Sequence, residues 1–390
     1  MTAEGPLYGD VWKTKRDPSK DPKRAPGPIH LNRYLVHPAY SGPQTFCKVP
    51  VCLNQADLRA GKVDVAICGV PMDTSIGQRG AAHGPMAIRN AEKALPGPRH
   101  GGLPHQHVRI DPFAVLRVVD YGDAAVNPLS IEESHQPIRE IIREIAETGA
   151  VPIVLGGDHS IMWPSCAAMA DVYGAGKIGV VHFDAHADCS SDVFGHLHSH
   201  GTPIRRLIED EHIPARNFIQ VGLRGYYPDD DLFAWMQAKG MRSHFMAEIE
   251  RKGFEAVMER ALEEALDGPE HLYVSVDVDA LDPAYAPGTG TPEPGGLTTR
   301  EMFPMIRRIA HEIGIVGMEV VEVAPAHDPG YTTALNAHRI VLEALTGLAM
   351  RKKKIKGRHY LHPVAAGEPP PAKAAAVASK SRAAKSKKKR

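Results

Sequence analysis

Asp184, His186 and Asp188 recur at a spacing of two residues in the segment HFDAHADCS (182–190), directly after a very apolar run. In an extended strand, a period of two places side chains on the same face of the sheet. Three such groups at the end of a buried strand would repel one another and lose their hydration unless a cation neutralised them. The segment therefore predicts a metal site, and Cys189 is expected to point to the opposite face from Asp188.

Two further segments end an apolar run with residues of the same kind. YVSVDVDALDP presents Asp277 and Asp279 with the same spacing, and in GGDHS a strand ends at two glycines before His159 opens the next helix. Each pattern alone is often structural, but three together rarely are. Carboxylates and imidazoles suit divalent ions such as Mn²⁺, Ni²⁺, Co²⁺ or Zn²⁺. The sequence thus predicts a two-metal site with the ligands His159, Asp184, His186, Asp188, Asp277 and Asp279.

Positioning these groups requires strands that end along a common edge. From residue 63 onward, short β-branched runs alternate with amphipathic stretches, a pattern typical of buried parallel strands and their covering helices. Strands are expected at 63–70, 117–122, 151–157, 178–184, 217–224, 271–279 and 315–323, with helices at 131–148 and about 333–348. This βαβ rhythm predicts an α/β fold, a three-layer α/β/α sandwich with a mostly parallel central sheet. Adjacent strands of such a sheet deliver residues at their carboxyl ends to one crevice.

The chain divides into three parts by composition. Residues 1–60 are expected to form an irregular arm, 61–350 the main domain, and 351–390 a basic tail with too little apolar content to fold alone. Residues 364–390 hold eight Lys/Arg and only Glu368 as an acid, a charge of +7, so the rest of this neutral chain carries −7. Clustered lysines attract polyanions, but no aromatic residues are interleaved, and a nucleic-acid partner is not favoured.

Cysteine usage and hydropathy indicate the compartment. The five cysteines are scattered without C-x-x-C spacing, which argues against a disulfide framework. The polar, proline-rich start has no signal-type apolar core, and no stretch approaches the roughly 18 apolar residues of a membrane span. These features predict a cytoplasmic protein without a membrane anchor.

GGDHS, FDAHAD and SVDVDALDPAYAPGTGTPEPGGL resemble the three signature segments of the arginase/agmatinase (ureohydrolase) family, over residues 63–350. The resemblance implies the arginase-like fold and makes the main domain a ureohydrolase catalytic domain. It implies that Asp184 and Asp277 bridge two metal ions, that His159 and Asp188 complete one coordination sphere, and that His186 and Asp279 complete the other. A metal pair of this kind lowers the pKa of a shared water towards neutrality and aims it at the guanidinium carbon.

The same resemblance assigns three catalytic roles. Glu322, at the end of the strand MEVVEVAP, is expected to pair with the substrate guanidinium. His200, in HLHSHGTP, is expected to shuttle a proton between solvent and the leaving amine. Asp279 could also accept the proton of the nucleophile. The implied reaction is hydrolysis of a guanidino compound to urea and an amine.

The loops around the predicted site bear on the substrate. Family members that act on a free amino acid hold its α-groups with residues that look absent here, since Ser190 and Gly225 stand where an Asn and an acid would be expected. Agmatinase-like enzymes are therefore the closer relatives, and arginine is not favoured. Agmatine, guanidinobutyrate, guanidine and a biguanide are the candidate substrates. The candidate pocket residues are His196, His198, Tyr226 and Tyr227, of which the two tyrosines could line an aromatic pocket.

The sequence also bears on the oligomeric state, on two alternative functions and on the metal ions. The family resemblance suggests a homotrimer or homohexamer, with the arm at 1–60 as an intersubunit strap and a hetero-oligomer with a paralogue as a variant. A metal-dependent amide deacetylase of the same fold would hold one catalytic metal and would not need all four aspartates. A non-catalytic partner subunit would be expected to lack a ligand, and none is missing. The favoured cofactor is a pair of Mn²⁺ or Ni²⁺ ions.

Overall fold

The computed structural model describes residues 24–31, 40–94 and 103–368. Its strands are β1 (Val65–Val70), β2 (Val118–Asp123), β3 (Val151–Gly156), β4 (Ile178–Phe183), β5 (Phe218–Leu223), β6 (Arg242–Phe245), β7 (His271–Asp277) and β8 (Gly317–Val321). Its α-helices are α1 (Gln55–Gly61), α2 (Gly84–Asn90), α3 (Pro112–Val115), α4 (Ile131–Ala146), α5 (Met162–Tyr173), α6 (Pro203–Glu209), α7 (Asp230–Lys239), α8 (Met246–Lys252), α9 (Phe254–Ala265), α10 (Thr299–Arg308) and α11 (Thr332–Lys352).

The eight strands form one sheet in the order β2-β1-β3-β8-β7-β4-β5-β6, and every pairing is parallel. Seven of them coincide with the predicted strands to within two residues at each end. The strand β6 was not predicted, because it has only four residues, RSHF, which are mostly polar and lie at the edge of the sheet.

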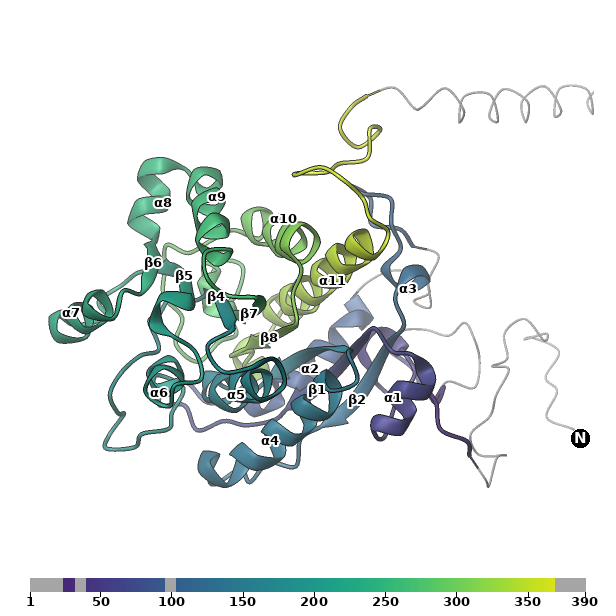
Figure 1. The fold of residues 1–390 in the computed structure, drawn as a ribbon, viewed down its shortest axis with the longest axis horizontal. Coiled ribbons are helices and arrows are strands. Elements are labelled where there is room, and N and C mark those ends of the chain that lie inside the picture. The colour runs from purple at the N-terminus through teal and green to yellow at the C-terminus, as the bar shows by residue number, and fades with distance from the viewer. Residues whose placement is uncertain (1–23, 32–39, 95–102, 369–390) are drawn as a thin grey trace, which may run out of the picture.

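Helices cover both faces of the sheet, as Figure 1 shows, with α4, α5 and α6 on one side and α8 to α11 on the other. Each face has its own apolar core. Ile138, Ile142 and Ile145 recur along α4 and are fully buried against β1 and β3, as the helical periodicity predicts. Ile340, Val341 and Ala344 of α11 lie in the core of the other face. The predicted three-layer α/β/α sandwich with a parallel sheet is therefore confirmed.

The strand order explains how the candidate residues meet. The four central strands are β3, β8, β7 and β4, side by side in the sheet. His159 follows β3, Glu322 follows β8, Asp277 ends β7 and Asp184 follows β4. Parallel strands share one carboxyl edge, so all four segments open onto the same crevice.

Part of the predicted arm lies against the main domain. Phe46 is fully buried and its ring stacks on His338 of α11 at a centroid distance of 4.4 Å. The backbone N–H of Phe46 donates to Asp120 at 3.0 Å. Residues 1–23 and 369–390 lie outside the described residues, so the division into arm, domain and tail, and the strap between subunits, stay predictions.

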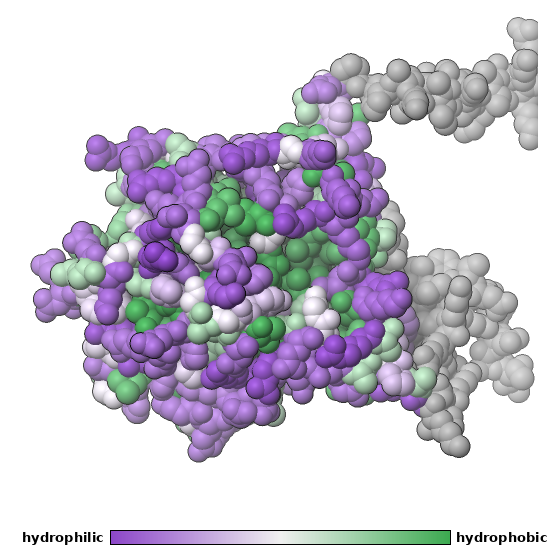
Figure 2. Space-filling view, in the orientation of Figure 1, coloured by the Kyte–Doolittle hydropathy of each residue, from purple (hydrophilic) through white to green (hydrophobic). Residues whose placement is uncertain are grey.

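The face drawn in Figure 2 is mostly hydrophilic, with hydrophobic residues gathered near its centre. Within the described ranges, no helix has both the length and the apolar character needed to cross a bilayer. The five cysteines all lie in these ranges, and none of them forms a disulfide bond. The cytoplasmic location stays a prediction.

Candidate metal centre

His159 is brought to the crevice by a tight turn after β3. A side chain at Gly157 would meet the carbonyl oxygens of Met72 and Val70 at 2.5 and 2.6 Å, so only glycine allows this close backbone approach. The Nδ1 atom of His159 then lies 3.0 Å from Asp184 Oδ2, 3.0 Å from Asp188 Oδ2 and 3.4 Å from Asp277 Oδ2. Four of the six predicted ligands therefore converge around one point.

The other two predicted ligands form a second group beside the first. His186 Nδ1 lies 3.0 Å from Asp279 Oδ2 and 3.6 Å from Asp184 Oδ1. Asp184 therefore turns one carboxylate oxygen towards the His159 group and the other towards the His186 group. This sharing is what a carboxylate bridging two adjacent ions requires, and the donor atoms of Asp184, His186 and Asp279 all lie within 4.8 Å of one another.

The sequence pattern predicted that these side chains share one face of a strand, but the structure brings them together in a different way. β4 ends at Phe183, so Asp184, His186 and Asp188 lie in the loop beyond the strand and not on its face. Asp188 has a left-handed backbone (φ 47°), a conformation that costs a non-glycine residue about 1 kcal/mol or more. The turn at Asp188, and not the alternation of a strand, directs its carboxylate back to His159.

Backbone N–H groups hold the carboxylates in place. His186 N donates to Asp184 Oδ1 at 2.6 Å, Asp279 N to Asp277 Oδ1 at 2.8 Å, and Ala185 N to Asp279 Oδ1 at 3.0 Å. The second carboxylate oxygen of each of these aspartates faces His159 or His186. The site is therefore preorganised by its own loops.

The electrostatics of the cluster fit a bound cation. Burial, together with the charges of Asp279 and Asp184, raises the pKa of Asp277 well above its ordinary value. Burial opposes a charged His186, but Asp279 and Asp184 outweigh it and raise the pKa of His186 to about 12. His159 Nδ1 and Asp184 Oδ2 are buried and make no hydrogen bond within the described chain, although they lie 3.0 Å apart. Excess negative charge around unbonded donor atoms is the environment that a divalent ion stabilises.

His182 is a member of the cluster that the sequence analysis did not single out. It is fully buried in β4, and its Nε2 atom lies 3.0 Å from Asp184 Oδ2. Its donor atom falls within 4.8 Å of those of His159, Asp184 and Asp188. The signal was present, because His182 precedes Asp184 by the same two residues, but a histidine inside an apolar strand is more often a packed core residue.

Behind the cluster, a chain of buried hydrogen bonds holds the ring of His159. His159 Nε2 lies 2.8 Å from Ser275 Oγ, Ser275 Oγ donates to Glu319 Oε1 at 2.8 Å, and Tyr273 OH donates to Glu319 Oε2 at 3.0 Å. Ser275, Glu319 and Tyr273 are all fully buried.

Arg224 holds the turn that carries Asp279. Its guanidinium donates to the carbonyl oxygen of Asp279 at 2.7 Å, of Gly222 at 3.2 Å and of Pro294 at 3.0 Å. Neither the role of Arg224 nor the hydrogen bonds behind His159 were predicted. Those hydrogen bonds join residues far apart in the sequence, and Arg224 binds backbone carbonyl oxygens, which have no sequence signature.

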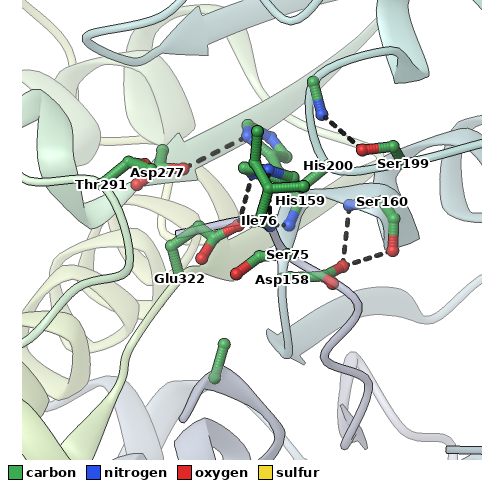
Figure 3. A network of polar contacts seen from close by, with 12 residues as sticks. Ser75, Ile76, Asp158, His159, Ser160, Ser199, His200, Asp277, Thr291 and Glu322 are labelled. Carbon is green, nitrogen blue, oxygen red and sulfur yellow. Dashed lines mark hydrogen bonds and ion pairs between the residues drawn. The ribbon is translucent and has the colours of Figure 1, made fainter. Parts of the chain in front are cut away.

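Glu322 and His200 lie beside this cluster, as Figure 3 shows. Glu322 is 1% exposed and has a left-handed backbone (φ 64°) just past the end of β8. Its Oε1 accepts the N–H of His159 at 2.9 Å and lies 3.7 Å from His200 Nδ1. The backbone N–H of Ile76 donates to His200 Nε2 at 3.2 Å. Glu322 therefore contacts the backbone of a predicted ligand directly, and His200 lies next to Glu322.

The four candidate pocket residues are separated by the structure. Tyr227 lies near the cluster, with its ring 6.3 Å from that of His186 and its hydroxyl 2.7 Å from Ser190 Oγ. His198 instead packs against the rings of Trp163 and His135, while Tyr226 and His196 are exposed. The carboxylate of Glu293 fills the space next to Gly225, so an acid from another loop lies where the sequence analysis found none.

Comparisons with known proteins all point to one protein family. Residues 63–347 match the arginase family. The chain is 38% identical to a guanidinopropionase of Pseudomonas aeruginosa, over 80% of this chain and 93% of that one, and 39% identical to a mitochondrial agmatinase of Gallus gallus, over 73% and 80%. Among solved structures, the proclavaminate amidino hydrolase of Streptomyces clavuligerus superposes with a TM-score of 0.70 at 31% identity, covering 81% of this chain and all of that one. The fold, the buried histidine–aspartate cluster and these matches together show that the chain belongs to the arginase family of ureohydrolases and is a hydrolase of linear amidines.

Proposed function

We propose that this protein hydrolyses a guanidino compound other than arginine to urea and an amine, using a pair of Mn²⁺ or Ni²⁺ ions. The observation that carries the proposal is the shared carboxylate of Asp184, whose two oxygens serve two histidine–aspartate groups beside a buried Glu322. His159 and Asp188 would hold one ion and His186 and Asp279 the other, with Asp184 and Asp277 common to both, as the family resemblance implies.

The chemistry divides between the ions and the chain. When bound, the metal pair supplies a water nucleophile of lowered pKa and neutralises the carboxylates. Glu322 binds and orients the substrate guanidinium, because its Oε2 is buried and makes no hydrogen bond within the described chain. His200, which accepts from Ile76 at Nε2, keeps a proton at Nδ1 near Glu322 and delivers it to the departing nitrogen.

The loops favour a substrate other than an amino acid. Ser190, in the position where a holder of α-groups would be expected, is hydrogen-bonded to Tyr227 at 2.7 Å. Agmatine, guanidinobutyrate, guanidine and a biguanide remain in the substrate panel. The relatives named guanidinopropionase and agmatinase support a guanidino substrate without choosing among these.

The test is a urea assay across this panel and arginine, with the metal-free protein loaded separately with Mn²⁺ and Ni²⁺. We expect urea from at least one panel member and none from arginine. Absence of urea from every compound under both metals would refute the proposal. The trimeric or hexameric state and the paralogous subunit stay predictions that mass measurement in solution checks.

A further inference from the structure

Two buried oxygen atoms beside the metal centre have no hydrogen-bond partner among the described residues. They are Ser75 Oγ, in the loop after β1, and Glu322 Oε2, after β8, and each residue is 1% exposed. Figure 3 shows the two side chains pointing toward one another. Leaving a buried polar atom unbonded costs about 1–3 kcal/mol, so two at one place indicate that a ligand completes them.

Gly290 defines the space between these atoms. A Cβ atom added to Gly290 would lie 3.2 Å from Glu322 Oε2 and 3.6 Å from Ser75 Oγ. The backbone of Gly290 is not left-handed, so a larger residue is disfavoured by these close contacts and not by backbone strain. We call the space bounded by Ser75, Gly290 and Glu322 the Gly290 niche.

The loop that carries Ser75 is held rigidly at this place. Asp158 Oδ2 accepts from the backbone N–H and the hydroxyl of Thr74, and Asp73 Oδ1 accepts from Ser75 N at 3.2 Å. Gln78 N donates to the carbonyl oxygen of Gly290 at 2.9 Å, which joins the two loops directly. Hydrogen bonds therefore hold the loops on both sides of the Gly290 niche in place.

We propose that the Gly290 niche receives one terminal NH₂ group of the substrate guanidinium, which donates to Ser75 Oγ and Glu322 Oε2. A guanidinium has only N–H donors, and both Ser75 Oγ and Glu322 Oε2 can accept from it. Ser75 is then a specificity-determining residue, and the substrates are guanidino compounds whose terminal nitrogens carry no alkyl group, because a methyl group there would occupy the position of a Cβ on Gly290. This inference rests on the proposed function.

The test compares Ser75→Ala and Gly290→Ala with the wild type, each loaded with metal. With the substrate found in the panel, Ser75→Ala raises KM roughly tenfold to hundredfold, as expected for the loss of a hydrogen bond to a charged group. Gly290→Ala lowers kcat/KM by at least as much, and both variants keep the wild-type metal content. Gly330→Ala is the matched control, since its added Cβ also has its nearest contact at 3.2 Å but lies outside the niche. It keeps wild-type kinetics.

A second readout separates this inference from hydrolysis itself. Calorimetric titration of the metal-loaded protein with guanidinium chloride and with its N,N′,N″-trimethyl analogue, in which every nitrogen carries a methyl group, measures binding. A urea assay of the same sample shows whether turnover contributes to the heat. The wild type binds the unsubstituted ion and not the alkylated one, and Gly290→Ala binds neither. If the ions bind in this pattern while no urea forms, the niche stands and the proposed hydrolysis fails. If urea forms and Ser75→Ala and Gly290→Ala keep the wild-type KM, the niche is refuted and the hydrolysis stands.

Discussion

The imidazole of His159 is held from behind by Ser275, whose Oγ lies 2.8 Å from the ring Nε2 on the side away from the aspartates. Ser275 Oγ donates its own proton to Glu319, so it can only accept from Nε2 of His159, which leaves Nδ1 to face the aspartates. The carboxylate of Glu319 thus fixes the orientation of a predicted metal ligand with which it makes no direct hydrogen bond.

Glu319→Gln should weaken metal binding tenfold to hundredfold, the usual order for a group that orients a ligating histidine. Competition with a metal-chelating dye measures this affinity directly. Tyr273→Phe is the control, because it removes only the outermost bond of the chain and should have a smaller effect. Unchanged affinity in a folded Glu319→Gln protein would contradict the positioning role.

Asp277→Asn should stabilise the metal-free protein while weakening its response to metal. Burial and the charges of Asp279 and Asp184 raise the pKa of Asp277, so folding without metal disfavours its carboxylate, and the neutral amide avoids that cost. The wild type should instead gain about 2.7 kcal/mol at a metal concentration 100 times its Kd. Thermal unfolding with EDTA and with Mn²⁺ measures both effects, and a metal-free Asp277→Asn protein that melts below the wild type would show that the charges do not repel.

His200→Ala should lower the turnover number while leaving the metal content unchanged, because His200 contacts Glu322 and the backbone of Ile76 and is not among the predicted ligands. Elemental analysis alongside steady-state kinetics separates the two quantities. Loss of metal from this variant would assign His200 to the metal site and end its role as a proton shuttle.

Glu343 of α11 should stabilise the fold only above acidic pH. Burial alone would raise the pKa of Glu343, but the hydrogen bond with His105 and the charge of Arg307 outweigh it and hold the pKa below its ordinary value. A lowered folded-state pKa contributes stability above the unfolded value of about 4.3, and that contribution is lost as pH falls through the folded value. Glu343→Gln should therefore be less stable than the wild type in denaturant at pH 7, and the difference should shrink below pH 4. A difference independent of pH would point to packing instead.

The sequence predicted the fold and singled out six residues that the structure brings together, because both depend on local signals. Apolar runs ended by Asp or His mark the carboxyl edge of a parallel sheet, whatever the exact end of each strand. The detailed geometry was less accessible: the left-handed turn at Asp188 has no local signature, and the loop replaced the strand face that the period of two had suggested.

Contacts between distant segments could not be predicted from the sequence. Ser275 and Glu319 read as ordinary strand residues, and only the pairing of β7 with β8 brings them together. Ser75 and Gly290 are 215 positions apart, and their common space exists only once both loops pack beside Glu322. His198 shares a segment with His200, yet the fold turns its ring into the cluster of Trp163 and His135.

The most direct test of the two-metal account is a titration of the metal-free protein with Mn²⁺, or with Ni²⁺, while urea release from the best panel substrate is recorded. Because Asp184 joins two ligand groups, activity should appear as the second equivalent of metal per subunit binds, and Asp184→Asn should bind neither equivalent tightly and release no urea. Full activity at one equivalent, or wild-type urea release by Asp184→Asn, would contradict a shared two-metal centre.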